Sequence, residues 1–191
     1  MAMPHTAPRL LRGHFTVADY HRLAEVGMLG PDARVELLDG QVVDMSPIGS
    51  RHAGTVNWLA ARLRQLVGAR AILSVQNPVV LDEYSEPEPD LALLAPRPDY
   101  YRGAHPRPRD VLLVVEVADT TLEKDRDVKL PLYARAGIQE VWIVDLNGER
   151  VEVYREPRAS AFESIAIRRG ADALTVFAIP DVELRAGEIL A

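Results

Sequence analysis

The sequence predicts an α/β or α+β fold, in which helices pack against a mixed β-sheet within one domain. Three observations support this fold class. VLLVVEV, residues 111–117, is a continuous apolar run, as is typical of a strand covered on both faces. Residues 52–67 place their apolar side chains on one helical stripe. Asp39-Gly40 separates two short apolar runs, which is a strong signal of a β-hairpin.

The N-terminal half is expected to hold helices at both sides of this hairpin and two further strands. In chain order we expect a flexible tail over 1–15, a helix over 16–26, the hairpin, the helix over 52–67 and strands over 71–81 and 90–94. Thr16 suits the N-cap of the first helix, and Gly27 suits its end. The stripe of the second helix, which it would turn towards the core, consists of Val56, Leu59, Leu63, Leu66 and Val67.

The C-terminal half is expected to add two buried strands. A loop rich in proline and arginine, residues 96–110, leads into the strand over 111–117, and VWIVD, residues 141–145, is the second apolar run. An Asn-Gly pair then marks a turn into a hairpin, after which short strands continue. This order predicts a single domain over residues 16–191 that has extra β-hairpins beside the main sheet.

A helix is expected to join the two buried strands. Thr120 and Glu123 have the spacing of a capping box at its start, and Gly137 marks its end. Pro131 falls inside this helix and should kink or split it, because proline has no backbone N–H to donate. Since the helix directly follows the strand over 111–117, it should pack near the end of that strand.

The composition is that of a soluble globular protein: 191 residues, of which 48% are hydrophobic and 26% are charged. The absence of cysteine excludes disulfides, thiolate zinc sites and a cysteine nucleophile. No apolar run approaches the roughly 18 residues that span a membrane, and the start of the chain lacks the apolar region of a signal peptide. We therefore expect a cytoplasmic protein without membrane contact.

The net charge of −6 argues against a protein that binds nucleic acid through bulk positive charge. It is compatible with an enzyme that contacts phosphates through local arginines and metal ions, because carboxylates gathered around a metal make the formal charge more negative. The sequence has no phosphate-binding glycine-rich loop, no GxSxG motif and no histidine pair at metal-binding spacing. The acidic residues are therefore the best candidates for chemistry.

Two acidic residues stand in apolar strands. Glu116 interrupts VLLVVEV, and Asp90 opens the strand DLALL directly after a proline. A buried carboxylate is paired or binds a metal, because an isolated buried charge is very unfavourable. If the two strands are neighbours, Asp90 and Glu116 suit Mg²⁺ or Mn²⁺. The alternative is that Asp90 is a turn residue and that Glu116 pairs with an arginine.

Lysine occurs only at Lys124 and Lys129, while all other basic residues are arginine. Lysine is a compact charge that can orient a water molecule, so its position shortly after Glu116 connects it with the acidic pair. The alternative is chance clustering on an exposed helical face. Because residues three and four apart share a helical face, Lys124 should point away from Lys129 and be exposed.

Several motifs occur in a definite order, namely Glu36 in VELLDG, His52 at a helix start, Pro89-Asp90, VVEV with Glu116, Asp125 and Lys129, then LYARAG and VWIVD. Together they resemble the Uma-type restriction endonucleases of the PD-(D/E)XK nuclease superfamily, roughly over residues 16–155. The resemblance implies a restriction-endonuclease-like fold with a mixed central sheet flanked by helices. It also implies a divalent-metal phosphodiesterase site at one edge of the sheet.

The resemblance further implies a role for each matching residue. Asp90 and Glu116 would bind Mg²⁺ or Mn²⁺, and Lys129 would orient the attacking water or help to deprotonate it. Glu36 would touch a second metal or a metal-bound water, or it would anchor the hairpin. His52 would contact phosphate, or it would cap its helix.

One position departs from the superfamily pattern. The superfamily's lysine stands two residues after the strand glutamate, where this chain has Ala118. In the Uma-type pattern the lysine stands in the following helix, and Lys129 matches it. Tyr133 is interpreted as a core residue, and nothing in the sequence decides whether Gln76 faces the site.

The loop over residues 96–110 is the most basic stretch of this acidic chain. It contains Arg102, Arg107 and Arg109 together with two tyrosines, a combination suited to phosphate contact and base stacking. We therefore expect these arginines to bind substrate; a solvated loop without such a role is the alternative.

The expected function is that of a divalent-metal-dependent endonuclease that hydrolyses phosphodiester bonds of DNA. A homodimer is a further expectation, because two cuts in a duplex need two sites. One alternative is a catalytically inactive nuclease-fold module that binds nucleic acid or protein. Another is a phosphodiesterase that acts on RNA or branched DNA.

Overall fold

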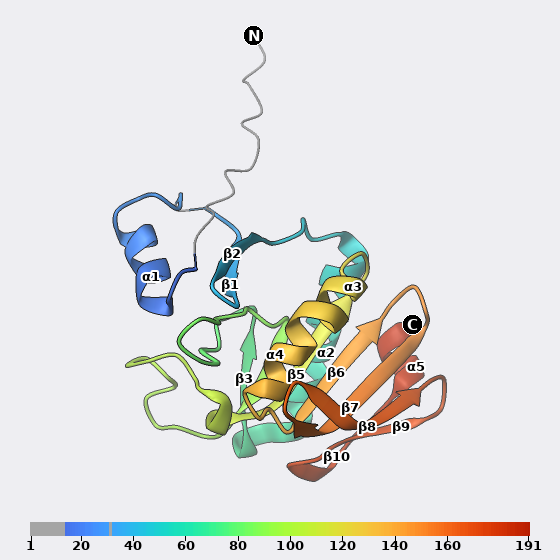
Figure 1. The fold of residues 1–191 in the computed structure, drawn as a ribbon. Coiled ribbons are helices and arrows are strands. Elements are labelled where there is room, and N and C mark those ends of the chain that lie inside the picture. Colours follow the sequence, from blue (N-terminus) through green and yellow to red (C-terminus); the bar gives the residue numbers. More distant parts are fainter. Residues whose placement is uncertain (1–13, 31) are drawn as a thin grey trace.

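The computed structural model describes residues 14–30 and 32–191. A six-stranded mixed sheet forms the centre, with helices packed on it and two separate two-stranded hairpins (Figure 1). This confirms the expected mixed sheet with extra hairpins. The expected tail lies outside the described residues except for His14, which stacks on Tyr84, and Phe15, whose N–H donates to the carbonyl of Gly40.

The central sheet keeps the order of the chain. Its strands are β3 (Ile72–Val75), β4 (Leu91–Leu94), β5 (Val111–Ala118), β6 (Glu140–Asp145), β7 (Arg150–Arg158) and β8 (Ala161–Arg168). Neighbouring strands are antiparallel except β5 and β6, which are parallel because a helical segment connects them. The two hairpins are β1 (Val35–Leu38) with β2 (Gln41–Asp44) and β9 (Ala173–Val176) with β10 (Ile179–Arg185).

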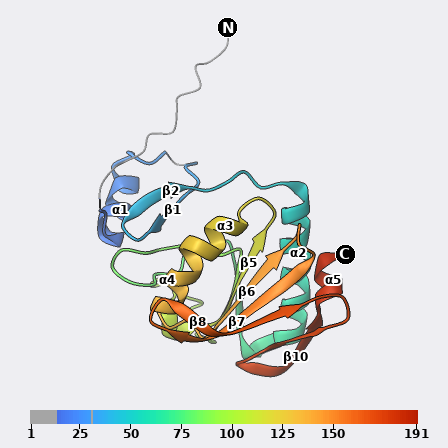
Figure 2. The same cartoon turned by 45° about the vertical axis from the view of Figure 1, so that its right-hand side comes forward.

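The helices cover both faces of the sheet (Figure 2). The helices on the sheet are α2 (Ser50–Val67), α3 (Leu122–Lys124), α4 (Leu130–Arg135) and α5 (Ala186–Leu190), with the short 3₁₀ segments η1 (Gly68–Arg70) and η2 (Pro108–Asp110). Helix α1 (Val17–Glu25) has no buried residue and lies beside the β1–β2 hairpin (Figure 1). A π-helical turn, η3 (Asp125–Lys129), joins α3 to α4. None of the described helices has both the length and the apolar character needed to cross a membrane.

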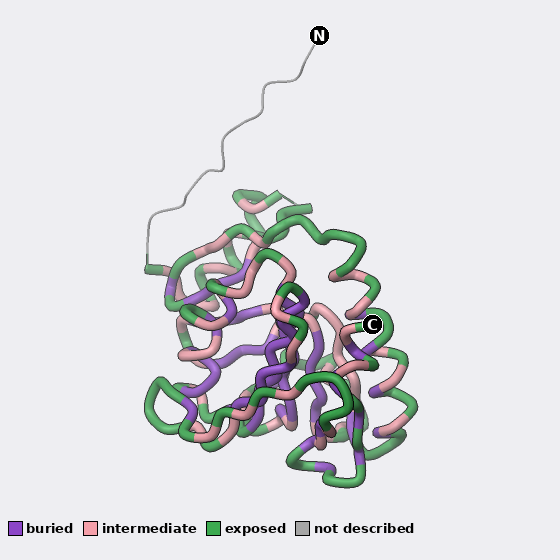
Figure 3. The backbone as a smooth tube through the Cα atoms, turned by 90° about the vertical axis from the view of Figure 1, so that its right-hand side faces the viewer, coloured by how far each residue is buried: buried purple, intermediate pink, exposed green. Residues whose placement is uncertain are grey.

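The side chains of β5 divide the core into two layers, because successive residues of a strand point to opposite faces. Val115 and Val117 pack on the side of α2 and of the β9–β10 hairpin. Val114 and Ala118 pack on the side of α4. Strand β5 is therefore buried on both faces, as its apolar run predicted. Figure 3 shows buried segments at the centre of the molecule and exposed segments around them.

Two boundaries differ from the sequence prediction, and both matter for the site. The strand expected over 71–81 ends at Val75, because Gln76 adopts a left-handed backbone with φ 49° and Pro78 follows, which has no N–H for a sheet. The helix expected over 52–67 begins at Ser50 and has no side-chain cap. His52 therefore lies inside the first turn of α2 and does not cap it.

The segment after β5 is the largest departure. The predicted capping box is wrong: the helix begins after Thr121 without a side-chain cap, and the hydroxyl of Thr121 donates to Asp125 instead. The predicted effect of Pro131 is confirmed, since the helix is split into α3, η3 and α4. The N–H of Leu130 donates to the carbonyl of Asp125, five residues back, just before the position where proline removes a donor.

Candidate active site

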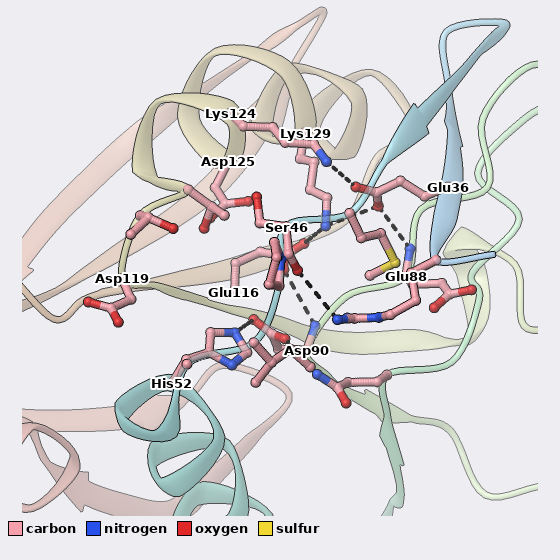
Figure 4. Close-up of a pocket in the computed structure, with 18 residues that line it drawn as sticks. Glu36, Ser46, His52, Glu88, Asp90, Glu116, Asp119, Lys124, Asp125 and Lys129 are labelled. Carbon is pink, nitrogen blue, oxygen red and sulfur yellow. Dashed lines mark hydrogen bonds and ion pairs between the residues drawn. The ribbon is translucent and has the colours of Figure 1, made fainter. Parts of the chain in front are cut away.

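A cavity of about 180 Å³ lies where β4 begins and β5 ends (Figure 4). Its walls come from β1, the segment after β2, the first turn of α2, the residues before β4, and the α3–η3 segment. Five residues singled out in the sequence line it, namely Glu36, His52, Asp90, Glu116 and Lys129. The fold thus gathers residues from positions 36 to 129 into one polar hollow.

Asp90 and Glu116 are brought together by the register of β4 and β5. Leu91 pairs with Val115 in this antiparallel ladder, so Asp90 lies opposite Glu116, on the adjacent strand expected from the sequence. The N–H of Asp90 lies 3.4 Å from Glu116 Oε2, and the N–H of Val117 donates to Asp90 Oδ2 at 2.9 Å. Each carboxylate is thereby tied to the backbone of the other strand.

Glu116 is buried and depends on its cationic and hydroxyl neighbours. Its Oε1 accepts hydrogen bonds from Lys129 Nζ at 3.1 Å and from the Tyr133 hydroxyl at 2.6 Å. Burial raises the pKa of Glu116 to about 8, and nearby Asp125 and Asp90 add to the rise while Lys129 opposes it. A charged Glu116 is therefore stable only with positive charge close by, which a bound cation would supply.

Lys129 is a buried ammonium held between two carboxylates. Its Nζ lies 3.1 Å from Glu116 Oε1 and 3.1 Å from Glu36 Oε2. Burial alone would lower the pKa of Lys129, but the carboxylates of Glu116 and Glu36 raise it above its ordinary value. The charged form of Lys129 is therefore favoured, which fits the expected role in orienting water, and the role in deprotonating that water stays a prediction.

Glu36 anchors both lysines of the chain from β1. Its Oε1 lies 2.7 Å from Lys124 Nζ, while its Oε2 contacts Lys129 Nζ and accepts the N–H of Glu88 at 3.2 Å. Burial would raise the pKa of Glu36, but the two lysines lower it overall. Both oxygens of Glu36 thus contact donors in this structure, and its contact with a second metal or a metal-bound water stays a prediction, as does the anchoring of the hairpin.

Asp90 is held by donors from three parts of the fold. His52 Nε2 lies 3.0 Å from Asp90 Oδ2, and Gln76 Nε2 donates to Asp90 Oδ1 at 3.2 Å. Burial raises the pKa of Asp90, but the bonds from His52 and Val117 lower it below its usual range. Asp90 is thus a charged carboxylate in a fixed orientation. The bond from Gln76 shows that this residue faces the site, a point the sequence left undecided.

His52 is hydrogen-bonded to Asp90. The hydrogen bond with Asp90 raises the pKa of His52. The other ring nitrogen, Nδ1, is buried and has no partner among the described residues. His52 therefore orients Asp90 in this structure, and its contact with substrate phosphate remains a prediction.

Asp90 and Glu116 fit a divalent cation by the chemistry of their donor atoms. Both are hard oxygen donors, and Mg²⁺ is usually bound through one or two carboxylates together with waters and substrate phosphate. Among the described residues, no three His, Cys, Asp or Glu side chains are arranged to hold a metal ion. An ion held by Asp90 and Glu116 would take its remaining ligands from water or substrate.

The arginine-rich loop lies apart from this cavity. It connects Leu94 at the end of β4 with Val111 at the start of β5, whereas Asp90 and Glu116 lie at the other ends of these strands. Arg102, Arg107 and Arg109 do not line the cavity, and the latter two border a separate surface depression. The structure therefore does not bring the three predicted substrate-binding arginines together with the acids.

Two functional contacts were missed by the sequence interpretation. Tyr133 is a core residue as expected, but its hydroxyl also donates to Glu116. It follows Lys129 by four residues, a spacing that places both on one helical face and could have revealed it. Lys124 was expected to be exposed and to point away, which is wrong: it lines the cavity and pairs with Glu36.

Tyr133→Phe tests the hydroxyl on Glu116. The substitution keeps the buried ring but removes a short hydrogen bond to a buried carboxylate, so we expect a loss of about 1 to 2 kcal/mol in the free energy of unfolding. Urea denaturation of the variant measures this loss. A variant as stable as the parent protein would show that the hydroxyl contributes nothing to holding Glu116.

Comparisons with known proteins identify the family and the fold. The family model described as "Uma2: Putative restriction endonuclease" matches residues 17–187, beyond the range over which the sequence motifs were recognised. A crystal structure described as "a putative nuclease belonging to DUF820" from Anabaena variabilis is similar with a TM-score of 0.63 and 13% identity, covering 82% of this chain and 89% of that chain. At this identity the similarity concerns the fold. No curated protein matches the chain.

Proposed function

The chain belongs to the Uma2 family of restriction-endonuclease-like proteins, and on this premise we propose that it is a divalent-metal-dependent endonuclease that hydrolyses phosphodiester bonds of DNA. One observation carries the proposal: Asp90, Glu116 and Lys129 meet in a single cavity although they come from separate elements. Two carboxylates can hold a divalent cation, and an ammonium can offset the negative charge that develops on a phosphate.

The acidic pair would hold Mg²⁺ or Mn²⁺. Such an ion would polarise the phosphate and lower the pKa of the attacking water. The protein prepares Asp90 for this task, because His52, Gln76 and the N–H of Val117 fix its carboxylate. Glu116 is fixed in turn by Lys129 and Tyr133.

Lys129 would supply a fixed positive charge during the reaction. Glu116 and Glu36 hold the ammonium of Lys129 in a fixed position at the cavity. The ammonium therefore need not move when negative charge develops on the phosphate. The contact with Glu116 also favours an enzyme over a catalytically inactive binding module. An inactive scaffold has no evident need to keep a buried ammonium beside a buried acid, because both charges are costly to desolvate.

A plasmid-nicking assay tests the proposed function. Purified protein incubated with supercoiled DNA should convert it to nicked or linear forms in Mg²⁺ or Mn²⁺, and should leave it intact in EDTA. Asp90→Asn should remove this activity. Single-stranded DNA and RNA in parallel reactions identify the preferred substrate. Intact DNA in every metal tested, with a folded and monodisperse protein, would contradict the proposal and favour the binding module.

The loop arginines should affect binding and not the chemical step. Because they lie at the far end of β4 and β5, we expect the combined change of Arg102, Arg107 and Arg109 to Ala to leave kcat unchanged. DNA affinity should fall, and the slope of log affinity against log salt should become less steep by about 0.9 for each lost phosphate contact. An unchanged salt slope would remove the loop from the DNA-binding surface.

A further inference from the structure

Lys124 is the lysine of the site that solvent reaches. Its side chain is 24% exposed, compared with 6% for that of Lys129, and both line the cavity with Asp90 and Glu116. Its ammonium is 2.7 Å from Glu36 Oε1 and makes a long contact of 3.5 Å with the carbonyl of Asp44. An ammonium has three N–H donors, so Lys124 can donate to an incoming group without leaving Glu36.

The π-helical turn is the reason that Lys124 faces the cavity. Lys124 immediately precedes η3, and Lys129 ends it. In an α-helix, residues five apart lie on different faces. In η3 the backbone hydrogen bonds join residues five apart, so the side chains of Lys124 and Lys129 lie on the same face. Both lysines consequently reach Glu36 from the same side (Figure 4).

The cavity that Lys124 lines is rich in carboxylates. Six acidic side chains line it, against the three cations Arg34, Lys124 and Lys129; the acids are Glu36, Glu88, Asp90, Glu116, Asp119 and Asp125. A phosphodiester that approaches such a surface is repelled unless a cation offers it a partner. Lys129 is buried between two carboxylates, so Lys124 is the better placed of the two lysines to meet the substrate.

We propose that Lys124 is a phosphate-contacting residue of this site, and that Glu36 is its positioning residue. The inference rests on the proposed function, because the ligand is a phosphate of the DNA backbone at the mouth of the cavity. Glu36 then serves two purposes: one oxygen orients Lys124 towards substrate, and the other holds Lys129 beside Glu116. The two lysines are thereby assigned to binding and to chemistry, respectively.

DNA binding without metal tests this assignment independently of catalysis. Fluorescence anisotropy of a labelled duplex in EDTA, over a series of salt concentrations, should show that Lys124→Ala weakens binding about 5- to 10-fold. The salt slope should become less steep by about one, as for the loss of a single phosphate contact. The matched control is Arg64→Ala, which removes one positive charge from an exposed position on α2 outside the cavity and should change neither quantity.

Further variants separate the phosphate contact from a merely structural role. Lys124→Arg keeps the charge and should recover affinity to within about 2-fold, since a guanidinium also binds phosphate. Lys124→Met keeps the aliphatic stem and should behave like Lys124→Ala even if the latter is less stable. Glu36→Gln should flatten the salt slope as Lys124→Ala does, because it releases the ammonium from its position.

The outcomes distinguish this inference from the proposed function. Wild-type affinity and salt slope in Lys124→Ala would overturn the assignment of Lys124, while metal-dependent cleavage by the parent protein would still stand. A parent protein that binds DNA without cleaving it would overturn the endonuclease, and the Lys124 result would still decide the phosphate contact. A parent protein that neither binds nor cleaves nucleic acid would overturn both.

Discussion

Glu116→Gln is expected to lower Mg²⁺- or Mn²⁺-dependent cleavage of DNA by about 10³-fold or more and to leave the fold intact. Glutamine has the shape of glutamate and can still accept hydrogen bonds from Lys129 and Tyr133. It lacks the negative charge of one of the two carboxylates that are proposed to hold the cation. Cleavage rates and isothermal titration with Mn²⁺ should therefore fall together.

The stability of this variant should stay the same or rise. Burial raises the pKa of Glu116 to about 8, which shows that its charge is unfavourable in the metal-free protein. A neutral amide removes that cost, and Lys129 keeps its ion pair with Glu36. The melting temperature measured in EDTA checks this expectation.

Glu152→Gln is a matched control of opposite sign. Glu152 is also a buried glutamate, but hydrogen bonds from Arg126, Tyr154 and Arg150 offset its burial and lower its pKa. Its charge is therefore stabilising, and the variant should lose about 1 to 2 kcal/mol in the free energy of unfolding, in contrast to Glu116→Gln. Metal-dependent cleavage that persists in Glu116→Gln would contradict the assignment of the acidic pair.

The strands of the core could be predicted because their signal is local. The apolar runs that form β5 and β6 can be recognised as strands without knowing which strands they pair with. The Asp-Gly turn likewise predicted the β1–β2 hairpin. The end of β3 was harder, since the left-handed backbone at Gln76 is imposed by tertiary contacts with Asp90. The C-terminal helix α5 has only five residues and leaves no clear periodic pattern.

The acidic pair could be predicted as a pair only on an assumption about neighbouring strands. The observed register of β4 and β5 satisfies it. The same assumption also determines where the arginine-rich loop lies. If β4 and β5 are antiparallel neighbours, the loop that joins them lies at one end of the pair. Asp90 at the start of β4 and Glu116 near the end of β5 then lie at the other end. The positive charge of the loop had suggested that its arginines bind substrate, but this topology places them away from the acidic pair.

The position of Lys124 was beyond simple helical spacing. The rule of three and four residues assumes an α-helix, whereas Pro131 interrupts the hydrogen bonding and a wider turn precedes it. Pro131 can be read from the sequence, but the π-helical turn that precedes it in the structure cannot. Arg126 contributes to the outcome, because it bonds to Glu152 on β7 and ties the turn to the sheet.

Lys129→Ala is expected to lower cleavage by about 10² to 10³-fold while Mn²⁺ binding persists. The ammonium is the fixed positive charge beside Glu116, and its removal takes away the buried cation nearest to the acidic pair. Metal affinity should stay equal or rise, because the site becomes more negative. This combination separates Lys129 from Glu116, whose replacement should lose cleavage and metal binding together.

The loss of Lys129 should also be felt in stability, in contrast to Lys124. Lys129 is buried between Glu116 and Glu36, and removing one partner of a buried ion pair leaves uncompensated charge at a cost of about 3 kcal/mol. Lys124→Ala should cost less, because its side chain is partly exposed and Glu36 keeps Lys129. Urea denaturation of both variants measures the difference.

Lys129→Arg should fail to restore cleavage, although it restores the charge. A planar guanidinium is bulkier than an ammonium and cannot occupy the same enclosed position 3.1 Å from both carboxylates without displacing one of them. Lys124→Arg should by contrast be tolerated, because the side chain of Lys124 is partly exposed to solvent. Full cleavage by Lys129→Ala or Lys129→Arg would mean that the buried ammonium serves the fold alone, and the catalytic charge would then have to come from another residue of the cavity.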